Sequence, residues 1–168
     1  MKNGSFDRDL SGWTLGSGEW ALDEPGRSGA AKVINPTYRY NGPEVSSARF
    51  GIWQCVKIYS NQEYELRVRS RMSRNFAKLG YGAAELTWFS TPNCYDEKRR
   101  RGGIVGSPAS VELTAIDGGW HELTLAAGYP PQNARSVEIA LSSVATDLKY
   151  KNPIEVWFDD VVFTAAHK

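Results

Sequence analysis

A two-residue alternation of apolar and polar side chains constrains the fold of this chain more than any other feature. Successive side chains of a β-strand point to opposite faces, so the alternation predicts strands with one buried and one outward face. No window of about a dozen residues keeps the 3.6-residue period of a helix. We therefore predict an all-β fold, an antiparallel β-sandwich or barrel. The nine expected strands are Glu19 to Leu22, Ala31 to Ile34, Ile52 to Tyr59, Tyr64 to Arg71, Ala84 to Phe89, Ser110 to Thr114, Glu122 to Leu125, Val137 to Leu141 and Glu155 to Phe163.

Two of these runs, Ile52 to Tyr59 and Tyr64 to Arg71, are separated by a short polar turn, and we expect them to form a hairpin. Its apolar face would pack on a core, while the opposite face would be exposed and rich in arginine. The outward side chains are predicted to be Trp53, Cys55, Lys57 and Tyr59 in the first run, and Glu65, Arg67, Arg69 and Arg71 in the second.

Length and charge narrow the range of partners. A chain of 168 residues without repeats or low-complexity linkers predicts one domain over residues 1–168. The net charge is +1, so no overall field attracts nucleic acid or a membrane surface. No run approaches the roughly 20 apolar residues of a membrane helix. The basic run Lys98 to Arg101 is interpreted as a solvated loop tip, with a contact to a polyanionic glycan as the alternative.

Cys55 and Cys94 are the two cysteines of the chain. They are too few for a structural zinc site and do not form a Cys-x-x-Cys pair. One disulfide in an oxidising compartment and two buried thiols are both consistent with the sequence.

Two acids, Asp159 and Asp160, interrupt the apolar run near the C-terminus. A buried carboxylate without a partner is costly, so it needs a cation, backbone donors or water. Calcium meets this need because it prefers carboxylate and carbonyl oxygens. A hydrogen-bonded Asp at a solvated strand end explains the same pattern without a metal.

Residues suited to catalysis are scarce. Neither His121 nor His167 lies near a nucleophile motif or a metal-binding pair. Hydrolysis would require two carboxylates on one sheet face, and Glu65, Glu85 and Glu138 are the residues that keep it open. We predict a protein that is not an enzyme. A small polysaccharide lyase or glycoside hydrolase is the lesser alternative.

Several short motifs, taken in order, carry a resemblance to a known group of proteins. They are Asn3 to Asp7, Ser11 to Trp13, Gly51 to Ile58 leading into Glu63 to Leu66, Trp120, and Phe158 to Val161. Together they resemble the carbohydrate-binding modules of the CenC-like group, families 4, 9 and 22, from Asn3 to Thr164. The resemblance implies a galactose-binding-like jelly roll of two antiparallel sheets, which binds polysaccharide chains without cleaving them. It also implies an extracellular module of a longer secreted bacterial protein, attached to or acting beside a glycan-degrading enzyme.

The same resemblance implies a structural calcium. Its ligands would be the Ser5 carbonyl, the Asp7 side chain, the loop from Ser28 to Ala31, and Asp159.

The resemblance also places a glycan cleft over the sheet that contains Tyr64 to Arg71. Relatives carry an aromatic platform there, whereas this chain carries Arg69 between Arg67 and Arg71. Guanidinium groups bind carboxylates or sulfates, so we expect a preference for acidic glycans. The alternative is that these arginines pair with Glu65, Glu85 and Glu138 as a charge ladder. The other predicted contacts are Trp53, Glu85, Phe89, Tyr38 and Tyr40, with Tyr81 and Tyr95 as further tyrosines at the cleft edge.

A protein of another class remains possible on the same fold. Sandwiches of this kind serve many partners, so a protein-interaction or adhesion module without a sugar cleft is the main alternative function.

Overall fold

The computed structural model describes residues 1–23, 28–36, 48–72, 74–76, 79–95, 102–113, 115, 117–146 and 153–166. Within these ranges ten strands form two antiparallel sheets, and a 3₁₀ turn covers Arg74–Phe76. Sheet A contains, in spatial order, β1 (Thr14–Leu15), β4 (Ala48–Lys57), β9 (Ser136–Ala145), β6 (Gly80–Phe89) and β7 (Ala109–Glu112). Sheet B contains β2 (Gly18–Leu22), β3 (Gly29–Asn35), β10 (Ile154–Ala165), β5 (Tyr64–Met72) and β8 (His121–Gly128).

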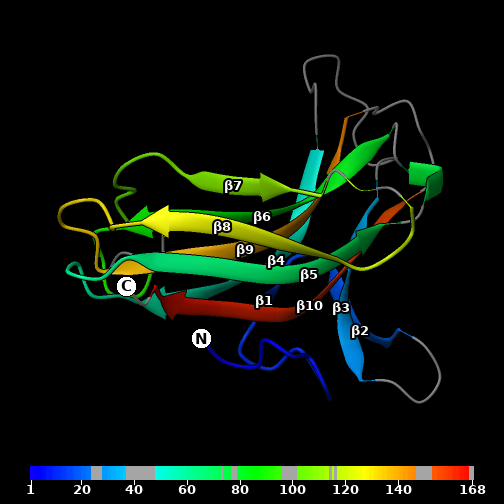
Figure 1. Cartoon of the computed structure of the whole chain (residues 1–168), viewed down its shortest axis with the longest axis horizontal. Helices are drawn as coiled ribbons and strands as arrows, with labels where there is room; N and C mark the ends of the chain where they lie inside the picture. The colour runs from blue at the N-terminus through cyan, green and yellow to red at the C-terminus, as the bar shows by residue number, and fades with distance from the viewer. Residues whose placement is uncertain are drawn as a thin grey trace.

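The predicted fold class is confirmed: the chain is an antiparallel β-sandwich with the jelly-roll arrangement of two sheets (Figure 1). Each of the nine expected runs overlaps an observed strand. The prediction missed β1, because two residues are too few to show an alternation.

The predicted hairpin is wrong, because β4 and β5 belong to different sheets. β4 pairs with β1 and β9, whereas β5 pairs with β10 and β8. Alternation shows only that each strand has one buried face, and both sheets of a sandwich supply such strands. The chain therefore crosses between the sheets at residues 58–63. The Tyr64 hydroxyl supports this crossing by accepting a hydrogen bond of 2.8 Å from the backbone N–H of Tyr59.

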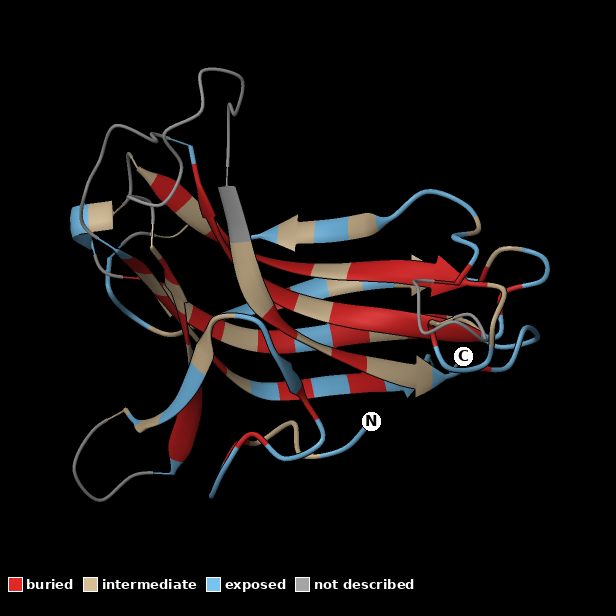
Figure 2. Ribbon diagram, turned by 180° about the vertical axis from the view of Figure 1, so that it is seen from behind, coloured by how far each residue is buried: buried red, intermediate tan, exposed pale blue. Residues whose placement is uncertain are grey.

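The core lies between the sheets and receives the predicted inward faces. Figure 2 shows buried and less buried positions alternating along β5 and β10. Ile52, Leu66, Leu86, Ile139 and Phe158 are each 0% exposed. Full burial of a side chain of this size contributes roughly 1.5–3 kcal/mol, so these contacts between the sheets hold the sandwich together.

The β10 strand contains an irregularity at the predicted acidic pair. Its register with β5 shifts between Asp159 and Val162. Asp160 has a φ of 48°, in the left-handed region, and its backbone N–H donates to Asp159 Oδ1 at 2.8 Å. Asp159 thus keeps the outward position that the alternation of β10 gives it, and the bulge at Asp160 lets the second acid face the outside as well.

Candidate functional site

An open hollow of about 420 Å³ lies on the outer face of sheet A. Its shape follows from the order of side chains across the sheet. Trp53 of β4, Ala140 of β9 and Glu85 of β6 are register neighbours in one row. Because Ala140 is small, it leaves a floor between the larger side chains on either side. The lining residues are Gly51, Ile52, Trp53, Glu85, Tyr95, Glu138, Ala140 and Ser142.

The neighbouring row extends this low floor. Gly51, Ser142 and Ala83 are register partners across the same three strands, and all three are small. A Cβ on Gly51 would lie 2.2 Å from the Leu141 carbonyl oxygen, so glycine is required for the close approach of β4 to β9. The face is therefore a shallow trough whose sides carry the large side chains.

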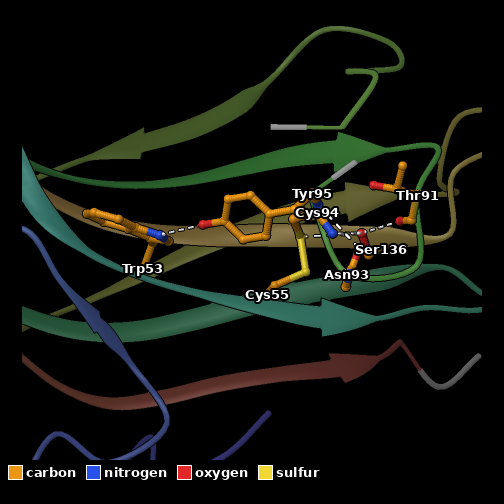
Figure 3. Close-up of a disulfide and its surroundings, with 7 residues drawn as sticks. All are labelled: Trp53, Cys55, Thr91, Asn93, Cys94, Tyr95 and Ser136. Carbon is orange, nitrogen blue, oxygen red and sulfur yellow. Dashed lines mark hydrogen bonds between the residues drawn. A yellow bond between two sulfur atoms is a disulfide. The ribbon is translucent and has the colours of Figure 1, made fainter. Parts of the chain in front are cut away.

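One side of the hollow is aromatic. Trp53 Nε1 donates a hydrogen bond of 3.1 Å to the Tyr95 hydroxyl, so the two rings are held beside each other (Figure 3). Tyr95 follows Cys94, which forms a disulfide with Cys55 on the same face of β4 as Trp53. The structure thus decides between the two states of the cysteines in favour of the disulfide.

The hollow also contains two carboxylates. Glu85 is half-buried, and Glu138 is only 5% exposed, in the row that also holds Cys55 and Thr87. Carboxylate oxygens are acceptors that can pair with several hydroxyl donors of a ligand. An aromatic wall beside acidic acceptors suits a ligand that has both apolar faces and hydroxyl groups.

The predicted site residues are divided between the two sheets. Trp53 and Glu85 line the hollow on sheet A, whereas Arg67, Arg69 and Arg71 lie on the outer face of sheet B. Sequence analysis put them near one cleft because it joined β4 and β5 in one hairpin. Since the strands belong to opposite sheets, their outward side chains face opposite sides of the molecule.

The arginines of sheet B already have partners. Arg67 pairs with Glu65, and Arg69 Nη1 lies 3.2 Å from Asp160 Oδ2. Arg71 pairs with Asp23, whose side chain is 6% exposed. The predicted charge ladder across neighbouring strands is wrong for Glu85 and Glu138, which lie on sheet A, and Glu65 pairs with Arg67 of its own strand.

Two tryptophans add to this arginine face. The Arg71 guanidinium carbon lies 4.9 Å from the centroid of the Trp157 ring and 5.2 Å from that of Trp120. Arg69 lies 5.3 Å from the Trp120 ring, and its side chain keeps 43% of its surface exposed. Arg69 and Arg71 thus form a row of cation–π contacts with Trp120 and Trp157 on sheet B. The Arg69 side chain is more exposed to solvent than that of Arg71.

Phe89 was predicted to stack on a ligand, but it is 0% exposed. Its strand position is outward, as expected, on the same face as Glu85. The chain then folds back over the end of β6: Phe89 forms a bridge with Ile104, and Val105 N donates to Trp88 O at 3.0 Å. These backbone contacts place the returning segment beside the end of β6, and the Phe89 ring is buried although its strand position is outward, which the alternation could not predict. Tyr38, Tyr40 and the basic run 98–101 lie outside the described residues.

The predicted metal ligands come from three separate parts of the chain. Asp159 is half-buried in β10, and burial raises its pKa to about 6, with nearby Asp160 and Asp7 adding to the rise. Asp7 is exposed and accepts a hydrogen bond of 2.6 Å from Ser5 Oγ. Two carboxylates that disfavour each other's charge form a donor set that fits a hard cation such as calcium.

The remaining predicted ligands supply at most backbone oxygens. Ser28 is exposed and Ala31 is 0% exposed in β3. Within the described ranges, no three or more His, Cys, Asp and Glu side chains gather in a way that could hold a metal ion. Carbonyl oxygens would thus have to complete any calcium site at Asp7 and Asp159.

From the sequence, Glu138 was considered only as a possible catalytic carboxylate or arginine partner, and Ala140 and Ser142 were not considered as site residues. The alternation in Val137 to Leu141 places Glu138 and Ala140 outward, so this signal was available. What was missing was the spatial order of strands, which sets β9 between β4 and β6.

None of the helical segments in the described ranges is long and apolar enough to cross a lipid bilayer.

The arrangement is that of a jelly-roll β-sandwich with a hollow on one sheet. No protein-family model matches the chain, and no curated protein matches its sequence. Solved structures do match. One is the enzymatically active domain of tailspike protein 4 of bacteriophage CBA120, with a TM-score of 0.67 and 13% identity over 99% of this chain. This chain spans only 21% of that structure's length.

Two further matches are carbohydrate-binding modules. A family 61 module in complex with β-1,4-galactotriose has a TM-score of 0.59 and 14% identity, and the match covers 99% of this chain and 97% of that one. The CBM22-1–GH10 modules of Clostridium thermocellum xylanase 10B, complexed with xylohexaose, give 0.59 and 15%, over 98% of this chain and 28% of that one. The chain thus has the fold of carbohydrate-binding modules, and the predicted resemblance is confirmed for the fold.

Proposed function

We propose that this chain is a non-catalytic module that binds a polysaccharide chain in the hollow on sheet A. The observation that carries the proposal is an aromatic wall, Trp53 and Tyr95, that faces the Glu85 carboxylate across Ala140, with a second carboxylate, Glu138, in the next row of the same hollow. Sugar rings have apolar faces that stack on aromatic side chains, and hydroxyl groups that donate to carboxylates.

Known ligands of similar folds support a β-1,4-linked glycan as the first ligand to test. The family 61 module is described in complex with β-1,4-galactotriose, and the xylanase modules with xylohexaose. Both ligands are uncharged chains. We therefore test uncharged β-1,4-glycans before polyanions.

Acidic glycans have a second candidate surface, on sheet B. Arg69 keeps 43% of its side chain exposed above the Trp120 ring, so its guanidinium can still reach an anion. We propose this arginine face, and not the hollow, as the place where the expected preference for acidic glycans would arise. Binding in the hollow of sheet A and binding on the arginine face of sheet B can be tested separately, because no residue belongs to both surfaces.

A calcium ion is part of the proposal. Asp7 and Asp159, with the Ser5 carbonyl and the backbone of Ser28 to Ala31, would hold it and link the N-terminal segment to β10. When bound, calcium would neutralise the two carboxylates. The proposal also keeps the module outside the cell, on a longer protein that degrades glycans, as in the xylanase in which a family 22 module accompanies a GH10 module.

Affinity electrophoresis tests the proposal directly. The purified chain is run through gels that contain xylan, β-1,4-galactan, alginate or pectin, each with calcium or a chelator. Retardation by a neutral β-1,4-glycan supports binding in the hollow, and retardation by acidic glycans alone supports the arginine face. No retardation by any polysaccharide would favour the protein-interaction alternative, and release of soluble sugar from a gel polysaccharide would show an enzyme.

A further inference from the structure

The aromatic wall of the hollow depends on a segment outside the sheet. Trp53 belongs to β4, but Tyr95 lies beyond the end of β6, six residues after Phe89. What attaches Tyr95 to β4 is the disulfide between Cys94 and Cys55, whose Cα atoms are 6.0 Å apart (Figure 3). Cys55 is two residues after Trp53 and on the same face, so the covalent link and the hydrogen bond from Trp53 to Tyr95 act side by side.

The backbone at Cys94 would not hold this position easily by itself. Its φ is 61°, in the left-handed region that costs a residue other than glycine roughly 1 kcal/mol or more. Hydrogen bonds help: Cys94 N donates to Ser136 Oγ at 3.1 Å, and Ser136 Oγ donates to the Thr91 carbonyl at 2.7 Å. Gly102 N donates to the Cys94 carbonyl at 2.8 Å and closes the loop behind it.

These hydrogen bonds and the disulfide connect Cys94 to different parts of the molecule. Ser136 and Gly102 bond to the backbone N–H and carbonyl of Cys94, and within the described residues these hydrogen bonds do not reach the Tyr95 ring. The disulfide joins Cys94 to the strand that carries Trp53. The disulfide is therefore the covalent link that keeps Tyr95 within reach of the Trp53 indole, while the hydrogen bond joins the two side chains directly.

We propose that the Cys55–Cys94 disulfide is a positioning element of the carbohydrate site: it holds Tyr95 against Trp53, and ligand binding therefore depends on oxidation of the cysteine pair. This inference rests on the proposed function and deepens it. Reduction by a dithiol transfers two electrons and two protons to the pair. The S–S bond breaks, each cysteine becomes a thiol, and the dithiol closes to a cyclic disulfide.

A set of four proteins tests the proposal: the oxidised wild type, C55A/C94A, Y95A, and the combination of all three substitutions. Affinity for the glycan that retards the wild type is measured at a temperature where all four are folded, as judged by far-UV circular dichroism. We expect C55A/C94A to lose at least about tenfold in affinity, which corresponds to about 1.4 kcal/mol. In the Y95A background, removal of the cysteines should change affinity less than about twofold, because both changes remove the same contact.

A disulfide that only stabilises the fold gives a different result. It would lower the melting temperature of C55A/C94A but leave its affinity equal to that of the wild type. Equal affinity, or the same loss with and without Tyr95, overturns the proposal.

A second readout needs no ligand and separates this proposal from the proposed function. The indole N–H signal of Trp53, assigned with W53F in ¹⁵N-labelled protein, should shift when the oxidised wild type is reduced, and C55A/C94A should show the shifted signal. If the signal shifts but no glycan binds, the positioning role stands and the proposed function fails. If the signal stays in place while glycan binds as before, the proposed function stands and the positioning role fails.

Discussion

Trp53 and Glu85 lie on opposite sides of Ala140, in one row across β4, β9 and β6. This relationship places an aromatic ring and a carboxylate at the two sides of a floor made by small residues. It marks the face on which we propose that a sugar chain binds, and it supplies the first prediction.

We expect Trp53→Ala to weaken binding of a neutral β-1,4-glycan by roughly tenfold or more, as for a central aromatic contact in an interface. Isothermal titration calorimetry with soluble oligosaccharides measures the change. Tyr59→Ala is the matched control, because Tyr59 is 61% exposed and lies outside the hollow. If Trp53→Ala binds as well as the control, the hollow is not the site.

The arginine face predicts a contrast in stability. Arg71→Ala should lower the free energy of unfolding by about 1–3 kcal/mol, since it leaves the nearly buried Asp23 carboxylate without its cation and removes packing on Trp157. Arg67→Ala should change it by less than about 0.5 kcal/mol, because the Arg67 side chain is 58% exposed. Urea titration of both variants measures this difference, and equal effects would contradict it.

The arginine face also predicts a difference between the binding of neutral and of acidic glycans. Arg69→Ala should leave affinity for neutral glycans unchanged and reduce retardation by alginate or pectin. If Arg69→Ala reduces both alike, the two faces do not act separately.

Calcium should raise the thermal stability of the chain. A ligand present at about 100 times its dissociation constant adds about 2.7 kcal/mol to the free energy of unfolding. Differential scanning calorimetry with calcium and with chelator measures the shift, and Asp159→Asn should abolish it. Identical melting curves of the wild type in both conditions would rule out this calcium site.

In chelator, stability should depend on pH through Asp159. The pKa of its carboxyl is raised by burial from 3.8 to about 6, so the folded state holds the proton more tightly than the unfolded state. This contribution is fully present below about pH 4 and is lost as the pH rises through about 6. Because about half of the group remains exposed to solvent, we expect less than about 2 kcal/mol. Urea titrations at about pH 4 and 7 should show the loss in the wild type and not in Asp159→Asn.

Much of the fold could be predicted from the sequence, because strand alternation is a local property. The inward positions of Ile52, Leu66 and Leu86 follow directly from it. The pairing of strands is not local. A short turn after Tyr59 is compatible with a hairpin and with a crossover, and only packing of the two sheets selects the crossover.

The site was accessible to sequence analysis only in part, for the same reason. Trp53 and Glu85 were identified as outward residues, but Glu138 becomes their neighbour only because β9 lies between β4 and β6. Phe89 shows the opposite effect, since its position on the strand is outward and its side chain is nevertheless buried. Sequence patterns therefore predict the face of each side chain, but not which strands or loops meet there.

The ring closed by the disulfide has a mechanical consequence. Cys55 and Cys94 are 39 residues apart, and the chain between them includes β5 of sheet B and β6 of sheet A. When a module is pulled between an anchored glycan and its parent protein, this ring cannot extend even after both sheets separate. At about 3.3–3.6 Å per residue, about 130 Å of chain is withheld from stretching. An oxidised module should therefore lengthen by that much less than a reduced one when it unfolds under force.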